Sequence, residues 1–261
     1  MSGPWQHILV ERDAGLATIT MNRPERRNAL SEAFMTELQA ALRDVGGHPD
    51  VRAIVLTATG PVFSAGHDFG DMVERDLDGM RRLLTVCRDL MLAIQRTPQP
   101  VVAGVQGMAT AAGCQLVASC DLAVALEEAT FATPGGKGGW FCMTPMVAVA
   151  RAIGRKRALE MLFTGEPIDA RTALAWGLVN RVVSRDRLRE ETEMLARAAS
   201  RGSPAAKALG KRTFYDTIDL DLEAAYAEAT EVMAASALTE DGREMMRAFL
   251  EKRTPVYPPR R

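Results

Sequence analysis

The sequence predicts an α/β fold, because short apolar runs alternate with longer amphipathic segments along most of its length. The apolar runs are bounded by Gly, Pro or Asp and show no polar alternation, which is typical of strands covered on both faces. With 261 residues and 47% apolar composition, the chain is long enough to bury a large core. From about residue 145 onward the pattern becomes mostly helical.

Each element has its own local signal. Strands are expected at Arg52–Ala58, Pro100–Gly107 and Asp121–Leu126. An amphipathic helix is expected over Ser31–Val45, with Ser31 as its N-cap, and a second helix over about Gly79–Arg96.

The C-terminal third carries helix boundaries of the usual kinds. One helix is expected to begin after Asp169 and to stop at Gly177, and another to follow the N-cap Ser203 with Pro204 in its first turn. We therefore divide the chain into an α/β core, residues 1–197, and a helical region, residues 198–261.

Composition excludes several function classes. A net charge of −1 gives no footprint for nucleic acid or an acidic membrane, and no apolar run reaches the roughly 18 residues of a membrane span. The start lacks the basic and apolar regions of a secretory signal, and the four cysteines form no CxxC pair. We therefore expect a cytoplasmic protein with free thiols. The three scattered histidines suggest no metal site, and PGGKGGW lacks the P-loop spacing.

Two short stretches of small residues follow expected strands, namely FSAGHD at residues 63–68 and ATAAGCQL at residues 109–116. The second is expected to open a helix, which leaves the amide of Ala112 without an intrahelical partner. The first could aim the amide of His67 at the same point. Two converging amides would form an oxyanion hole for a thioester oxygen. The alternative is that both are ordinary tight turns.

Taken in order, these stretches and four others resemble the enoyl-CoA hydratase/isomerase, or crotonase, family. The other four are NRPERRNALS, FATPG, LFTGEPIDARTALAWGLVNRVV and AFLEKRTPVY, and the resemblance runs from about Trp5 to Tyr257. It implies a spiral of β-β-α turns, a helical C-terminal trimerisation region, and a homotrimer or dimer of trimers. It also implies an acyl-CoA thioester as the ligand, with coenzyme A as part of the substrate and no separate cofactor.

The resemblance also implies roles for individual residues. It gives the oxyanion amides to His67 and Ala112. Residues expected to contact substrate or coenzyme A are Arg23, Arg26, Arg27, Ala65, His67, Asp68, Phe69, Gly70, Trp140, Phe249 and Lys252. Of these, the arginines would lie near phosphates, and Phe249 and Lys252 would reach a neighbouring subunit's ligand.

Two positions depart from the hydratases of that family, which carry glutamates where this chain has Gln115 and Gly135. Neither residue can exchange a proton near neutral pH, and a positioned acid or base is worth roughly 10²- to 10⁴-fold in rate. We therefore expect weak or atypical hydration. The same departure is seen in the subgroup of enoyl-CoA hydratase domain-containing proteins, which the segment from FATPGGKGGW onward resembles most.

Three interpretations stay open. The first is another branch of the family, such as the malonyl-type acyl-CoA decarboxylases. This chain has Phe141 where those enzymes have a tyrosine, so Trp140 and Lys137 would have to bind the substrate carboxylate. The second is a hydratase or isomerase whose acid or base comes from elsewhere, with His67 or Cys114 as candidates. The third is a non-catalytic acyl-CoA-binding protein.

Overall fold

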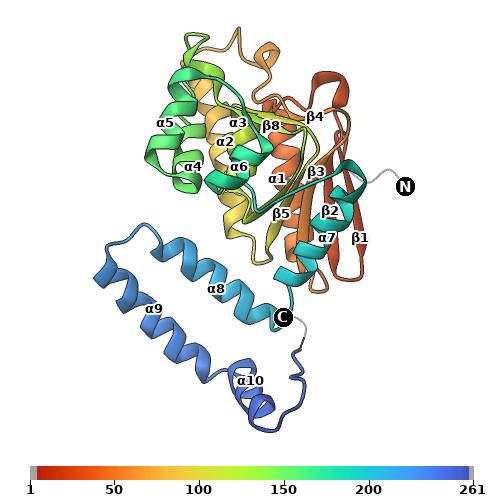
Figure 1. Cartoon of the computed structure of the whole chain (residues 1–261), viewed down its shortest axis with the longest axis vertical. Helices are drawn as coiled ribbons and strands as arrows, with labels where there is room; N and C mark the ends of the chain where they lie inside the picture. The colour runs from red at the N-terminus through yellow and green to blue at the C-terminus, as the bar shows by residue number, and fades with distance from the viewer. Residues whose placement is uncertain (1–4, 259–261) are drawn as a thin grey trace.

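Two sheets and their covering helices form the body of the protein, and three C-terminal helices extend from it (Figure 1). The structure is a computed structural model that describes residues 5–258. The strands are β1 Ile8–Asp13, β2 Leu16–Met21, β3 Ala53–Ala58, β4 Val62–Ser64, β5 Val101–Val105, β6 Met108–Thr110, β7 Leu122–Leu126, β8 Thr130–Ala132, β9 Ile168–Asp169 and β10 Arg181–Val183. The helices are α1 Glu32–Gly47, α2 Leu77–Arg96, α3 Ala112–Ser119, α4 Pro145–Ile153, α5 Arg155–Thr164, α6 Ala170–Trp176, α7 Leu188–Ala199, α8 Pro204–Thr217, α9 Leu222–Ala237 and α10 Glu240–Leu250.

The chain climbs through the two sheets in repeated β-β-α turns. One sheet has the order β1-β2-β3-β5-β7-β10 and the other β4-β6-β8-β9. The turns β3-β4-α2 and β5-β6-α3 each add one parallel strand to each sheet before the helix, and β7-β8 adds the next pair. This is the spiral that the family resemblance implied, and it sets β4 and β6 side by side.

The strands β3, β5 and β7 of the long sheet are buried on both faces, as their uninterrupted apolar runs predicted. Ile54 and Leu56 of β3 belong to the larger core cluster, which includes residues of α1 and α2. Val55 of the same strand points to the other face, where it clusters with Ala196 of α7. Successive side chains of a strand alternate between faces, so both faces must be apolar.

Helix boundaries follow the predicted capping residues. The Ser31 hydroxyl accepts a hydrogen bond from the Phe34 amide at 3.2 Å, and the Asp169 carboxylate accepts one from Thr172 at 2.7 Å. Gly177 ends α6 with φ +89°, and the Ser203 hydroxyl caps α8. These caps satisfy amides that have no intrahelical acceptor.

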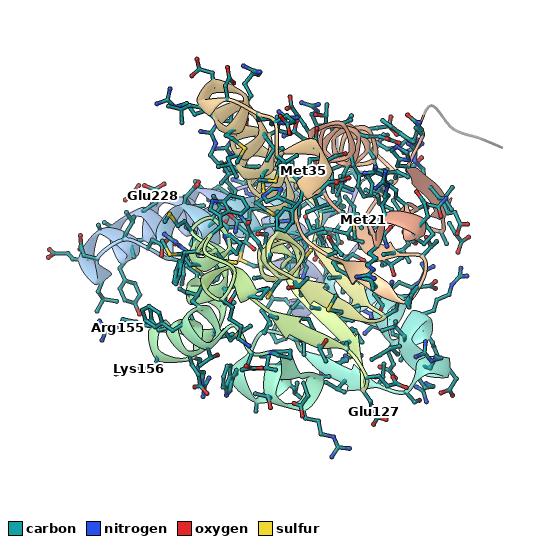
Figure 2. The ribbon with its side chains drawn as sticks, turned by 90° about the horizontal axis from the view of Figure 1, so that it is seen from above. Met21, Met35, Glu127, Arg155, Lys156 and Glu228 are labelled. Carbon is teal, nitrogen blue, oxygen red and sulfur yellow. The ribbon has the colours of Figure 1, made fainter. Side chains whose placement is uncertain are left out.

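The view from above separates packed from solvated side chains. Met21 and Met35 lie inside the body of the protein and are fully buried. The charged side chains labelled in Figure 2 lie at its periphery and are exposed, namely Glu127, Arg155, Lys156 and Glu228. The labelled methionines therefore belong to the interior of the body, and the labelled charged residues belong to its surface.

The helices α8, α9 and α10 lack a core of their own. Neither α8 nor α9 has a buried apolar residue within the described part of the chain, and α10 buries only Ala248. Large apolar side chains are exposed along them, among them Phe214, Ile218, Leu222, Tyr226, Met233, Leu238, Met245, Phe249 and Leu250.

A buried polar cluster ties α8 to the body. The Lys211 ammonium donates hydrogen bonds to the Asp121 carboxylate at 2.6 Å and to the Ile94 and Gln99 carbonyls, each at 2.9 Å. The Tyr215 hydroxyl donates to the other Asp121 oxygen at 2.8 Å. Burial lowers the pKa of Lys211 and raises that of Tyr215. Because the Lys211 and Asp121 side chains are only 10% and 15% exposed, each charge depends on the other.

We predict that Asp121→Ala destabilises the protein by about 3–5 kcal/mol, because it leaves the Lys211 ammonium buried without its counter-charge. The matched control is Asp219→Ala, which removes the partner of Arg151 in a pair that is 57% and 60% exposed and should cost less than about 1 kcal/mol. Urea unfolding at one fixed protein concentration measures both. Equal losses for the two variants would show that the buried cluster does not hold α8.

Candidate functional site

The two small-residue turns predicted to act together lie in contact. They follow the parallel neighbours β4 and β6, which pair Ser64 with Ala109. Gly66 has φ +85°, and a methyl group placed on it would lie 2.9 Å from the Ala111 Cβ and 3.2 Å from the Ala112 nitrogen. Only a residue without a side chain allows this approach.

The second turn carries backbone strain. Ala111 has φ +51° and ψ −118°, a conformation that costs a non-glycine residue roughly 1–3 kcal/mol. Its amide donates to the Ala132 carbonyl at 2.9 Å, which fixes the strained residue to β8. Ala112 then begins α3. Within residues 5–258, the amides of Ala112 and His67 have no hydrogen-bond acceptor. Buried amides without acceptors are rare and point to a ligand atom that would accept from them.

The first turn is held in place by residues 27–30. The Leu30 amide donates to the Gly66 carbonyl at 2.7 Å, and the Ala65 amide donates to the Arg27 carbonyl at 3.0 Å. Asn28, fully buried with φ +50°, donates from its side chain to the Thr59 and Val62 carbonyls. The role of Asn28 was not predicted from the sequence. The available signal was its residue type, because asparagine adopts the left-handed backbone conformation in loops more often than most residues.

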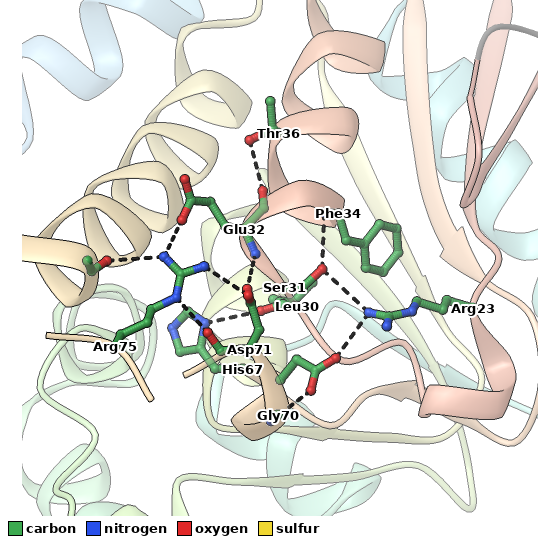
Figure 3. Close-up of polar contacts among 12 residues, drawn as sticks. Arg23, Leu30, Ser31, Glu32, Phe34, Thr36, His67, Gly70, Asp71 and Arg75 are labelled. Atoms are coloured by element: carbon green, nitrogen blue, oxygen red, sulfur yellow. Dashed lines mark hydrogen bonds and ion pairs between the residues drawn. The ribbon is translucent and has the colours of Figure 1, made fainter. Parts of the chain in front are cut away.

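A charged network lies beside this turn (Figure 3). The Arg75 guanidinium pairs with the Glu32 carboxylate and, at 2.8 Å, with Asp71. The other Asp71 oxygen accepts from the Glu32 amide at 2.8 Å. These contacts join the start of α1 to the segment that follows His67.

Arg23, predicted to lie near phosphates, is engaged inside the protein. Its guanidinium is 3.2 Å from the Asp68 carboxylate and 3.4 Å from the Ser31 hydroxyl. Arg26 and Arg27 are exposed. Asp68 also accepts from the Gly70 amide at 3.1 Å, so two predicted ligand-binding residues hold their own loop.

The His67 ring lies under an aromatic cover. Its centroid is 6.3 Å from that of Trp140, which is 6.5 Å from that of Phe69. Phe69 is 70% exposed and Trp140 44%, whereas His67 is only 9% exposed. Burial lowers the pKa of His67, although its contact with the Leu30 carbonyl and the charge of Asp71 act in the opposite direction. Its imidazole is therefore neutral at pH 7.

Gln115 follows Ala112 on α3 and is buried. Its side-chain oxygen accepts a weak hydrogen bond from the Cys87 thiol at 3.9 Å. Burial raises the pKa of Cys87 and of Cys114 to about 12, so neither thiol transfers protons readily at neutral pH. The four cysteines are free thiols, as predicted, and all four are buried.

Gly135 lies in a crowded part of the loop between β8 and α4. A methyl group on it would lie 2.1 Å from the Trp140 carbonyl oxygen and 2.8 Å from the Cys142 sulfur. Its amide also donates to that sulfur at 3.4 Å. Position 135 therefore accepts no side chain unless the segment from Trp140 to Cys142 moves.

Two predicted ligand-binding residues lie apart from the others. Phe249 is in α10 and Lys252 follows it, at the opposite end of the molecule from α3 (Figure 1). Phe249 is 81% exposed, and Lys252 is exposed.

The described residues contain no cluster of three or more histidine, cysteine, aspartate or glutamate side chains that could hold a metal ion. In the same part of the chain, every helix is too short or too polar to cross a membrane.

Known proteins resemble this chain over nearly its whole length. The family model for enoyl-CoA hydratase/isomerase matches residues 11–260. Enoyl-CoA hydratase domain-containing protein 3, mitochondrial, is 44% identical in Mus musculus, where the match covers 93% of this chain and 81% of the relative. The Homo sapiens protein is 46% identical over 93% of this chain and 80% of its own.

Solved structures agree with the fold. The human enoyl coenzyme A hydratase domain-containing protein 3 has a TM-score of 0.92 and 44% identity, covering 96% of this chain and 100% of that one. An enoyl-CoA hydratase of Mycobacterium smegmatis has a TM-score of 0.93 and 47% identity, covering 96% and 98%.

The cytoplasmic location expected from the sequence is wrong by this comparison, because the vertebrate relatives are mitochondrial by name. The sequence features behind that expectation bear only on secretion and on membrane spans. Mitochondrial import uses Arg-rich amphipathic segments without an apolar region, so the missing apolar region did not argue against it.

We predict that Gly66→Ala destabilises the protein more than Gly202→Ala. Both glycines have positive φ, so both variants lose roughly 1–2 kcal/mol to backbone strain. Nothing lies within 4 Å of a methyl group on Gly202, whereas Gly66 would press on Ala111 and Ala112, and overpacking typically costs about 1–3 kcal/mol more. Urea unfolding measures the difference, and equal losses would contradict the close approach of the two turns.

Proposed function

The chain belongs to the enoyl-CoA hydratase/isomerase family, and on that premise we propose that the amides of His67 and Ala112 bind the carbonyl oxygen of an acyl-CoA thioester. The observation that carries the proposal is the contact between Gly66 and the Ala111–Ala112 turn, together with two buried amides that lack acceptors. Such donors stabilise an oxygen that gains negative charge, as in a thioester enolate.

The reaction we favour is enolate chemistry with weak hydration. A hydratase must activate water and protonate carbon, and Gln115 is a neutral amide. Gly135 offers no side chain, and the Trp140 carbonyl occupies the space where one would begin. The oxyanion hole would therefore act without the two glutamates that hydratases of the family carry at these positions.

Decarboxylation of a malonyl-type acyl-CoA is a second candidate. The loss of CO₂ leaves the electron pair that forms the enolate, so this reaction needs no base. The Trp140 ring lies 6.3 Å from that of His67, and its indole nitrogen would donate a hydrogen bond to the substrate carboxylate. Lys137 is less suitable, because its ammonium already pairs with Glu166. The non-catalytic alternative predicts tight acyl-CoA binding without any product.

Coenzyme A would lie along the first turn. Ala65 and the segment from His67 to Gly70 would contact its adenine and pantetheine, and Arg26 and Arg27, both exposed, would meet its phosphates. Arg23 would have to leave Asp68 to join them, so we assign it to holding the loop.

We propose a homotrimer or dimer of trimers, in which residues 198–261 pack against other subunits. The exposed apolar side chains of α8 to α10 support this assembly, because such surfaces are normally covered. Phe249 and Lys252 would then contact the coenzyme A of a neighbour. The division at residue 197 stays a prediction, since α7 runs on to Ala199.

Ala112→Val should weaken acyl-CoA binding, because two added methyl groups crowd the oxyanion hole. A penalty of roughly 1–3 kcal/mol corresponds to about 5- to 150-fold in affinity. Calorimetric titration with crotonyl-CoA measures it, and Ala33→Val on the exposed face of α1 is the control. If Ala112→Val binds as tightly as the control, the hole does not lie at Ala112.

Gln115→Glu alone should raise the rate of crotonyl-CoA hydration, because it adds a carboxylate to a side chain of nearly the same shape beside the site. Gly135→Glu should instead lower stability, because its side chain overlaps the Trp140 carbonyl. Hydration is followed by loss of the enoyl absorbance, and folding by circular dichroism. Fast hydration by the unmodified protein would overturn our account of the missing glutamates.

A further inference from the structure

The buried ring nitrogen Nε2 of His67 has no hydrogen-bond partner within the described chain. The ring's other nitrogen, Nδ1, lies 3.4 Å from the Leu30 carbonyl oxygen. A carbonyl only accepts hydrogen bonds, so Nδ1 carries the proton and Nε2 keeps its lone pair. A buried polar atom left without a partner normally costs free energy and needs an explanation.

The position of the His67 ring explains why its Nε2 has no partner in the protein. His67 follows Gly66 and contributes the amide that, under the proposed function, holds the thioester oxygen. The carbon that carries acidic hydrogens in an acyl thioester is two bonds from that oxygen. The Trp140 ring lies 6.3 Å from the His67 ring, centroid to centroid, and Gln115, a neutral amide, follows Ala112 on α3. No other imidazole or carboxylate belongs to these two turns apart from Asp68, which is paired with Arg23.

We propose that Nε2 of His67 is the proton-transfer group of this site, taking a proton from the α-carbon of a bound acyl-CoA and returning it. This inference rests on the proposed function. The Nε2 lone pair forms the new N–H bond, and the C–H electrons form the C=C bond of the enolate. The carbonyl π electrons move to the oxygen held by the amides of His67 and Ala112, and the reverse step restores the thioester. No oxidant or co-reactant is needed.

The charged groups near the ring fit a neutral base. Asp71 faces it from the following segment and is held by Arg75, which also pairs with Glu32 of α1. Asp68 is paired with Arg23. In the loop between β8 and α4, which carries Trp140, the Lys137 ammonium is paired with Glu166. Burial raises the pKa of Cys142 in the same loop. Burial lowers the pKa of His67 by more than the Leu30 contact and the charge of Asp71 raise it, so the pKa lies below its ordinary value of 6.5.

The experiment follows deuterium uptake from D₂O at the α-carbon of butyryl-CoA by mass spectrometry. His67→Gln keeps the backbone amide and removes the base, so exchange should fall about 10²- to 10⁴-fold while calorimetric binding of butyryl-CoA is retained. The control is His48→Gln at the end of α1, which should exchange like the unmodified protein.

The unmodified protein gives a second measurement that does not depend on the variant folding. Exchange should be constant near pH 7 and fall about tenfold per pH unit below the His67 pKa, which lies under 6.5. Three results would each overturn the inference: binding with no exchange, exchange unchanged in a folded His67→Gln, or an exchange rate that already begins to fall at a pH well above 6.5. Failure of the unmodified protein to bind butyryl-CoA would overturn the proposed function instead.

Discussion

The close approach of Gly66 to Ala111 and Ala112 is the constraint on which the site depends. It requires a glycine at position 66, and it requires β4 and β6 to be neighbours. The spiral provides that neighbourhood, because each turn adds one strand to the short sheet beside the previous one. The buried sheets and the polar contacts of residues 27–30 then hold the two turns at a separation that side chains would prevent.

Sequence reasoning predicted the elements well where one local signal decided them. Capping residues such as Ser31, Asp169 and Ser203 set helix starts through hydrogen bonds made within one turn of the chain. Uninterrupted apolar runs indicated strands covered on both faces, and they form the long sheet. The spiral itself came from family resemblance, since strand order depends on contacts between distant segments.

Details of the site were less accessible because they depend on side chains meeting across the fold. The pairing of Arg23 with Asp68 joins positions 45 residues apart, and no local pattern predicts it. The crowding at Gly135 depends on the path of the loop through Trp140, and the unpartnered nitrogen of His67 depends on a carbonyl of another segment. The residues of the two turns indicated only that their side chains are small and that a histidine is the candidate proton-transfer group beside them.

The loop around position 135 also limits which substitutions this sequence can accept during evolution. Position 115 lies on a helix beside a neutral thiol, so a single replacement there changes chemistry without changing shape. Position 135 differs, because every residue other than glycine meets the backbone of Trp140. As long as that backbone keeps its path, descendants of this chain remain confined to glycine there. The two positions therefore differ in reversibility: one can gain a carboxylate in one step, and the other only after its loop has been rebuilt.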